Sequence, residues 1–244
     1  MKHLLTLLFV LSVLGISAQE SGPIVTDRPT QSAASNVVPK GSALIEYGFI
    51  HESVGDVTNI TFANFLARVG LLDGLEFRIT QNYLQVKDDA SDFDVSGLSP
   101  ITLGTKVHLI EERGAIPQVS IIGQVTFANG NEAFKPSQSI PEVRLSFSNS
   151  LTESLSLGYN IGMTFPEEST QTLYTLVLGY SFAPGWTVFA EPYGFFYDGE
   201  SDQRFNTGLI YLCSDKVQFD ISGGFGLSDI SPDSFIGFGA AIGF

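Results

Sequence analysis

The chain has 244 residues, which is enough for one domain. Charged residues make up 16% of it, aromatic residues 12%, and the formal net charge is −14. This balance argues against nucleic-acid binding, which needs a basic face. Because Cys213 is the single cysteine, an internal disulfide and a cysteine-based metal cluster are excluded.

Residues 1–18 have the pattern of a secretory signal peptide. Lys2 supplies the positive start, Leu4 to Ile16 the apolar stretch, and Ser17-Ala18 a small-residue cleavage site before Gln19. The apolar stretch is too short to span a bilayer, and no cysteine follows it to carry a lipid anchor. We expect an exported mature protein.

Residues 19–41 are rich in Ser, Pro, Thr and Asn and show no sustained alternation, which predicts an extended N-terminal arm. Thr26-Asp27-Arg28-Pro29 lies within this arm. Two interpretations stay open. The arm is a flexible periplasmic tail, or it tucks into the domain that follows, where Asp27 and Arg28 pair with internal charges.

From residue 42 onward, apolar and polar residues alternate with a period of two, and turn residues separate the alternating segments, as expected of β-strands. The segments lie at 42–52, 59–70, 75–86, 99–110, 116–128, 139–149, 154–165, 171–182, 186–197, 204–213, 217–227 and 234–244. An even number of strands of roughly ten residues is typical of outer-membrane barrels. We therefore predict an all-β fold, a transmembrane antiparallel up-and-down β-barrel of about 12 strands over residues 42–244.

The connections between the predicted strands alternate in kind. One set is short, at 71–74, 111–115, 150–153, 183–185 and 214–216. The other is mostly longer and more polar, at 53–58, 87–98, 129–138, 166–170, 198–203 and 228–233. Short periplasmic turns and longer extracellular loops match this alternation, and an even strand number places both termini on the periplasmic side.

Several strands separate their two faces cleanly. Leu75, Phe77 and Ile79 alternate with Glu76, Arg78 and Thr80, and residues 142–147, 155–164 and 217–222 follow the same pattern. An Arg or Lys on the lipid face near mid-bilayer costs about 2–4 kcal/mol, so we expect the polar faces to point into the lumen. A soluble sandwich would show the same alternation with its polar face outward, but the strand number and the export signal favour the membrane.

The last segment, Ser234 to Phe244, is predicted to close the barrel by pairing with the first strand. Its larger side chains alternate with small ones: Ile236, Phe238, Ala240, Ile242 and Phe244 against Gly237, Gly239, Ala241 and Gly243. The first set is expected to contact outer-membrane lipid. We also expect the barrel-insertion machinery to recognise this strand, which ends at Phe244.

The same parity predicts which charges line the lumen. With the arm, the candidate solute path comprises Asp27, Arg28, Glu46, Arg68, Glu76, Arg78, Lys106, Glu142, Arg144, Glu191 and Asp220, and His108 shares the parity. Buried charges need partners, so ion pairing across the lumen is one interpretation. A polar path or a binding site for a small solute is the other.

Several short motifs resemble an outer-membrane transporter family named for a MetA pathway of phenol degradation. They are Thr26-Asp27-Arg28-Pro29, Val38-Pro39-Lys40-Gly41, Leu75-Glu76-Phe77-Arg78, Leu103-Gly104-Thr105-Lys106 and Val188-Phe189-Ala190-Glu191. The resemblance covers most of the mature chain and implies a barrel that carries small compounds, hydrophobic or aromatic ones among them. It marks Asp27, Arg28, Glu46, Glu76, Arg78, Lys106 and Glu191 as polar positions characteristic of the family. The loops are short here, which argues against an elaborate external binding surface.

The resulting functional prediction is an outer-membrane channel or transporter for a small solute, with a plugged structural or binding barrel as the alternative. A barrel hydrolase is the weakest candidate, since His51 and His108 are the only histidines left after the signal peptide. We expect no enzyme activity, no cofactor and no metal, because the sequence has no phosphate-binding loop, no metal-ligand spacing and no calcium loop.

Overall fold

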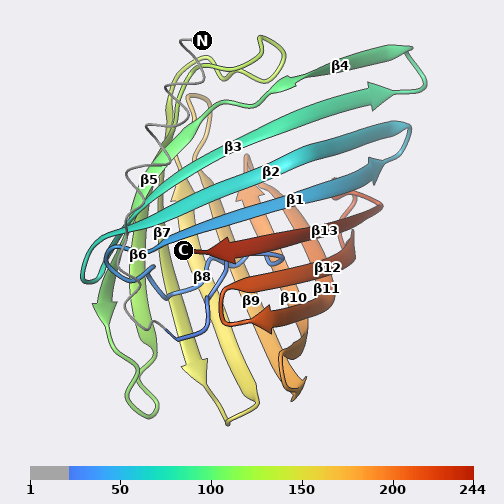
Figure 1. The fold of residues 1–244 in the computed structure, drawn as a ribbon. Coiled ribbons are helices and arrows are strands. Elements are labelled where there is room, and N and C mark those ends of the chain that lie inside the picture. The colour runs from blue at the N-terminus through green and yellow to red at the C-terminus, as the bar shows by residue number, and fades with distance from the viewer. Residues whose placement is uncertain (1–21) are drawn as a thin grey trace, which may run out of the picture.

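The computed structural model describes residues 22–244, so the predicted signal peptide lies outside the described residues. The described chain forms one antiparallel sheet that curves into a barrel (Figure 1). Its strands are β1 (Ala43–Val54), β2 (Val57–Leu72), β3 (Leu75–Asp88), β4 (Phe93–Leu98), β5 (Thr102–Ile110), β6 (Gln118–Thr126), β7 (Ile140–Ser150), β8 (Leu155–Thr164), β9 (Gln171–Ala183), β10 (Trp186–Tyr197), β11 (Glu200–Ser214), β12 (Val217–Gly226) and β13 (Ser234–Gly243).

The sheet closes through its first and last strands. β1 pairs with β13 from Leu44 opposite Gly243 to Ser53 opposite Ser234, and the backbones of Ala43 and Phe244 exchange hydrogen bonds. β4 and β5 pair with successive parts of β3 and together occupy one strand position, so the 13 strands make a 12-stranded barrel. We call each of these 12 strand positions a stave. The predicted fold class and the closing role of the last strand are confirmed.

The outer wall carries the large apolar side chains. On β13, Ile236, Phe238 and Ile242 are exposed outward, whereas Gly237, Ala241 and Gly243 are buried on the inner side. The alternation follows from the pleat, which points successive side chains to opposite faces. Among residues 22–244, no helix is long and apolar enough to cross a membrane.

An aromatic belt runs across the outer surface of β13, β1, β2 and β3. Phe49 stacks on Phe238 at 5.2 Å and meets Phe62 at 6.0 Å, and Phe62 lies 6.2 Å from Tyr83. Aromatic belts of this kind mark the interface between lipid and water. The outward positions of β3 beyond Tyr83 are the polar Gln85 and Lys87, so we expect this end of the strand to extend past the lipid.

The prediction of longer loops at 53–58, 87–98 and 198–203 is wrong, because strands occupy much of each segment. β1 and β2 meet at Gly55 and Asp56, and β10 and β11 meet at Asp198 and Gly199. Gly55, Asp198 and Gly199 have positive φ, which suits two-residue hairpin turns. The predicted loop 87–98 contains β4, because β3 continues to Asp88 and pairs back onto Phe93–Leu98. Turn geometry, rather than polarity, therefore decides the length of these hairpins.

Residues 22–41 add no strand to the wall and run inside the barrel. Ile24 donates its backbone N–H to the carbonyl of Asp215, in the short turn before β12, so the arm enters at the end where the short turns lie. Val38, near the other end of the arm, packs against Leu44 and Ala241 of the wall. The backbone then passes over Gly70, where any side chain would collide with the carbonyls of Val38 and Pro39.

Candidate functional site in the barrel lumen

The arm crosses the lumen at one level and reaches nearly the whole circumference of the wall. Every stave except β13 contributes a side chain that hydrogen-bonds the arm: Glu46, Arg68, Glu76, Lys106, Ser120, Ser148, Asn160, Thr175, Glu191, Asn206 and Asp220. The twelfth, β13, lies beside the arm at Gly239. These contacts make the arm a plug.

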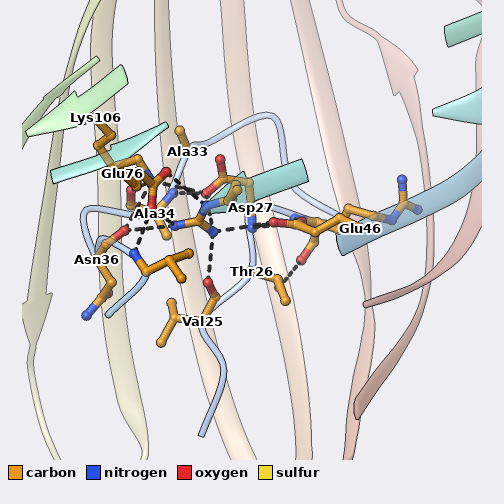
Figure 2. Close-up of polar contacts among 12 residues, drawn as sticks. Val25, Thr26, Asp27, Ala33, Ala34, Asn36, Glu46, Glu76 and Lys106 are labelled. Carbon is orange, nitrogen blue, oxygen red and sulfur yellow. Dashed lines mark hydrogen bonds and ion pairs between the residues drawn. The ribbon is translucent and has the colours of Figure 1, made fainter. Parts of the chain in front are cut away.

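Asp27 is the centre of the most charged part of this plug (Figure 2). Its carboxylate lies 2.6 Å from Arg78, 3.4 Å from Arg68 and 3.5 Å from Lys106. The three cations come from three neighbouring staves, β2, β3 and β5. Inward parity on adjacent strands therefore brings together charges that are far apart in the sequence.

Glu46 and Glu76 complete the cluster. Arg68 lies 2.9 Å from Glu76 and 3.3 Å from Glu46, and Glu76 also lies 2.9 Å from Arg78. The wall thus supplies three cations and two carboxylates, and Asp27 of the arm supplies the third carboxylate. The arm therefore neutralises a buried site that would otherwise hold one excess positive charge.

Wall carboxylates also bind the backbone of the arm. Glu46 accepts the N–H groups of Asp27 and Arg28 at 3.0 and 2.8 Å. Glu191 accepts those of Gln31 and Ser32 at 2.9 and 2.8 Å. An irregular segment in a buried position must satisfy its peptide groups, and these side chains do so in place of a strand partner.

Arg28 connects the arm to the other side of the barrel. Its guanidinium lies 2.9 Å from Asp220 on β12 and donates to Asn64 on β2 at 3.1 Å. The group occupies the space where a side chain at Gly48 or Gly239 would stand. The small residues on the inner face of β1 and β13 therefore make room for the arm.

Uncharged polar residues, together with Lys106, hold the middle of the arm. Asn160 on β8 accepts the N–H of Ala33 at 2.7 Å and donates to its carbonyl at 3.0 Å. The hydroxyl of Ser32 donates to Thr175 at 2.6 Å, and Lys106 Nζ donates to the carbonyl of Ala34 at 2.7 Å. Asn160 and Thr175 were absent from the predicted site, although their inward parity could have indicated them.

Two predicted site residues lie apart from the charged cluster around Asp27. Glu142 and Arg144 pair with each other on β7 at 2.9 Å, and Arg144 reaches the arm through the carbonyl of Gln31 at 3.2 Å. His108, which shares their parity, lies 3.1 Å from Glu111 near the short-turn end. No group of His, Cys, Asp and Glu within residues 22–244 is arranged to hold a metal ion.

The arm separates two spaces in the lumen. A cavity of about 660 Å³ lies toward the short turns, where serines, glycines and threonines such as Ser148, Gly179 and Thr187 line it. A smaller cavity of about 230 Å³ lies on the other side, between the arm and β1, β2 and β10–β13. Arg28 and Thr30 line both cavities, so the arm is the partition between them.

Residues 26–244 match the model of the family described as "Putative MetA-pathway of phenol degradation". The chain belongs to this family. The match begins at Thr26, so the family pattern includes the plugging part of the arm as well as the barrel. The search of curated proteins gave no match.

Solved outer-membrane proteins share the fold at low sequence identity. The COG4313 outer membrane channel from Pseudomonas putida F1 superimposes with a TM-score of 0.69 at 14% identity, over 88% of this chain and 100% of that one. The NanC porin gives 0.60 at 7% identity, over 81% and 98% of the two chains. The KdgM porin in complex with oligogalacturonate gives 0.57 at 12% identity, over 82% and 99%.

These matches confirm the fold, a closed antiparallel β-barrel like those of outer-membrane proteins. The solved proteins that share this fold are themselves named as a channel and porins. The exposed apolar side chains on the outer wall of this chain suit contact with lipid. The family and the barrel predicted from the sequence are both confirmed.

Proposed function

We propose that the protein is a gated outer-membrane channel for a small solute, with residues 22–41 as a displaceable plug. The observation that carries this proposal is the partition of the lumen by an arm that contacts the wall on nearly every stave. The family's description supports a hydrophobic or aromatic solute. The candidate path consists of the predicted lumen residues. Asp27 and Arg28 belong to the arm, most of the others hold the arm from the wall, and Glu142 and Arg144 pair with each other on β7.

The chemistry of the plug suits displacement. The arm is held by ion pairs and hydrogen bonds, and its buried apolar contacts are few: Val38 and Ile24 against Leu44 and Ala241. Water that enters the lumen can replace polar bonds far better than it can replace apolar packing. The arm can therefore leave its seat while the wall of the barrel stays folded.

Conductance in planar bilayers tests the proposal. The intact chain is expected to show small or intermittent currents, and a variant that lacks residues 22–41 is expected to conduct continuously. Retention of the folded barrel is checked by its migration in gels before and after heating. An equally large, steady current from the intact chain would refute the plug, and a folded deletion variant that passes neither ions nor solute would refute the channel.

A plugged structural or binding barrel is the second candidate, and the number of bonds between arm and wall favours it. The two proposals differ in liposomes. A channel carries a small aromatic solute into liposomes that contain the intact protein, whereas a permanently plugged barrel leaves them as impermeable as protein-free liposomes.

We also propose that the barrel-insertion machinery binds the strand Ser234–Gly243 and the terminal Phe244. Phe244 is exposed, and the outward residues of β13 form a continuous apolar edge before closure with β1. Deleting Phe244 should lower the yield of inserted barrel in cells. An unchanged yield would remove this partner.

A further inference from the structure

The 230 Å³ cavity, on the side of the arm away from the short turns, has two chemically distinct sides. Ile50, Leu66 and Phe235 provide an apolar side. Asn64, Asn206 and Arg204 provide a polar side. Pockets that bind small molecules combine apolar lining with placed polar groups, and this cavity brings an apolar side together with polar and charged side chains. Its floor is the arm itself, from Asp27 to Gln31.

The charges that line this cavity are already paired. Arg204 lies 3.0 Å from Glu52 and 2.6 Å from Asp202, so two carboxylates share one guanidinium. Arg28 is bound to Asp220, and Glu46 accepts two backbone N–H groups of the arm and lies 3.3 Å from Arg68. No cation on the described lining is left to bind an anion, and a cation would have to displace Arg204 from Glu52 and Asp202. An uncharged molecule leaves these pairs intact.

Asn206 offers an unused hydrogen-bond acceptor. Its Nδ2 donates to Glu191 at 3.0 Å and to the carbonyl of Pro29 at 3.4 Å, which determines the orientation of the amide. Its Oδ1 is buried and has no hydrogen-bond partner among the described residues. A buried acceptor without a partner costs about 1–3 kcal/mol, which a hydroxyl donor would recover.

Asn206 Oδ1 also links the binding of a ligand to the position of the arm. Oδ1 has almost no exposed surface in this arrangement, so a donor reaches it only when the amide or the adjoining arm shifts. The nearest bonded arm group is the carbonyl of Pro29, which Nδ2 holds by the longer of its two bonds. A ligand that engages Asn206 therefore competes with the seating of the arm.

We infer that this cavity is the recognition site for a small, uncharged solute with an apolar body and a hydroxyl group, and that its occupancy favours release of the arm. The inference rests on the proposed channel function and names the solute class and its site. The apolar body contacts Ile50, Leu66 and Phe235, and the hydroxyl donates to Asn206 Oδ1.

Calorimetric titration of the intact protein in detergent tests this site. Benzyl alcohol, benzoate and benzylamine are matched probes, because they share the ring and differ in the polar group. We expect saturable binding of benzyl alcohol, and at least about tenfold weaker binding of benzoate, corresponding to about 1.4 kcal/mol. Empty micelles provide the correction for partition of the probes into detergent.

Three variants locate the binding. Asn206→Leu removes the acceptor and is expected to weaken benzyl alcohol binding about tenfold, the value of one buried hydrogen bond. Leu66→Trp fills the cavity and is expected to abolish binding. Asn82→Leu is the matched control, because it removes an amide that accepts the backbone N–H of Phe65 within the wall and neither holds the arm nor lines this cavity.

The inference is overturned by benzoate or benzylamine binding as tightly as benzyl alcohol, by unchanged binding in Asn206→Leu or Leu66→Trp, or by the absence of saturable binding. Its failure can be told from failure of the channel. Solute flux without saturable binding overturns the site and leaves the channel, whereas saturable binding at Asn206 without flux retains the site and overturns the channel.

Discussion

At the scale of single residues, Asp27 is decisive because it is the only carboxylate that the described part of the arm, residues 22–41, brings to the cationic cluster. Arg68, Arg78 and Lys106 all lie within 3.5 Å of it. Removing one partner from a buried ionic group leaves an uncompensated charge, which costs far more than the net value of the intact pair. Arg28, on the other side, has one ionic partner among the residues that the structure describes, Asp220.

Asp27→Asn should therefore loosen the arm. We expect the free energy that holds the arm in place to fall by about 3 kcal/mol, the lower end of the cost of breaking a buried ion pair. Open time in bilayer recordings and protease cleavage of the arm should both increase. Asp94→Asn is the control, because its 3.9 Å pair with Lys87 is exposed and distant from the arm. Equal behaviour of the two variants would contradict this role of Asp27.

At the scale of elements, the arm and the wall have opposite kinds of stability. Every strand except β4 pairs with at least two neighbours, whereas residues 22–41 of the arm depend on side chains and have only the Lys40–Gly70 bridge as strand-like pairing. Segments with few buried apolar contacts open at lower free energy than the core. The arm is therefore the element expected to move.

A disulfide between the arm and the wall should lock the plug. Ser32 and Thr175 have hydroxyl oxygens 2.6 Å apart, so we expect Ser32→Cys with Thr175→Cys, in a Cys213→Ser background, to suppress flux until a reductant is added. Ser53→Cys with Thr58→Cys is the control pair, since these residues face each other across β1 and β2 outside the arm. Flux that is insensitive to the first disulfide would show that the arm does not gate.

At the scale of the whole molecule, the lipid band and the lumen impose opposite demands on alternate residues. The outer wall exposes residues such as Ile161 and Phe219, while the inner positions beside them, Asn160 and Asp220, are buried. Both demands are met at once only in a closed barrel, which has no unpaired edge in the membrane. Closure of β1 on β13 is therefore the basis of stability for the entire molecule.

Charges on the outer wall should accordingly be tolerated only beyond the aromatic belt. Ile161→Arg is expected to lower the free energy of unfolding by about 2–4 kcal/mol, as Arg near mid-bilayer does in other barrels. Gln85→Arg, outward on β3 past Tyr83, should change it little. Urea unfolding in lipid vesicles, followed by the fluorescence of Trp186, measures both. Similar losses in the two variants would place the lipid band elsewhere.

The sequence by itself determined the barrel, the inward direction of Glu46, Glu76 and Asp220, and the closure by the last strand. Its period-two pattern suffices for this because the pleat alternates side chains in every strand, whatever the partner strand is. It also raised the possibility that Asp27 and Arg28 enter the lumen, without deciding between that and a periplasmic tail.

Only the tertiary structure decided the position of the arm, the hairpins that replace three predicted loops, and the identity of the pairs. Asp27 meets Lys106, and Arg28 meets Asp220 across 192 positions of the chain. Pairings of this kind depend on which staves become neighbours and how far each hairpin shifts its register. The alternation within one strand does not specify its neighbour or its register, because it is the same for every register that keeps the polar face inward.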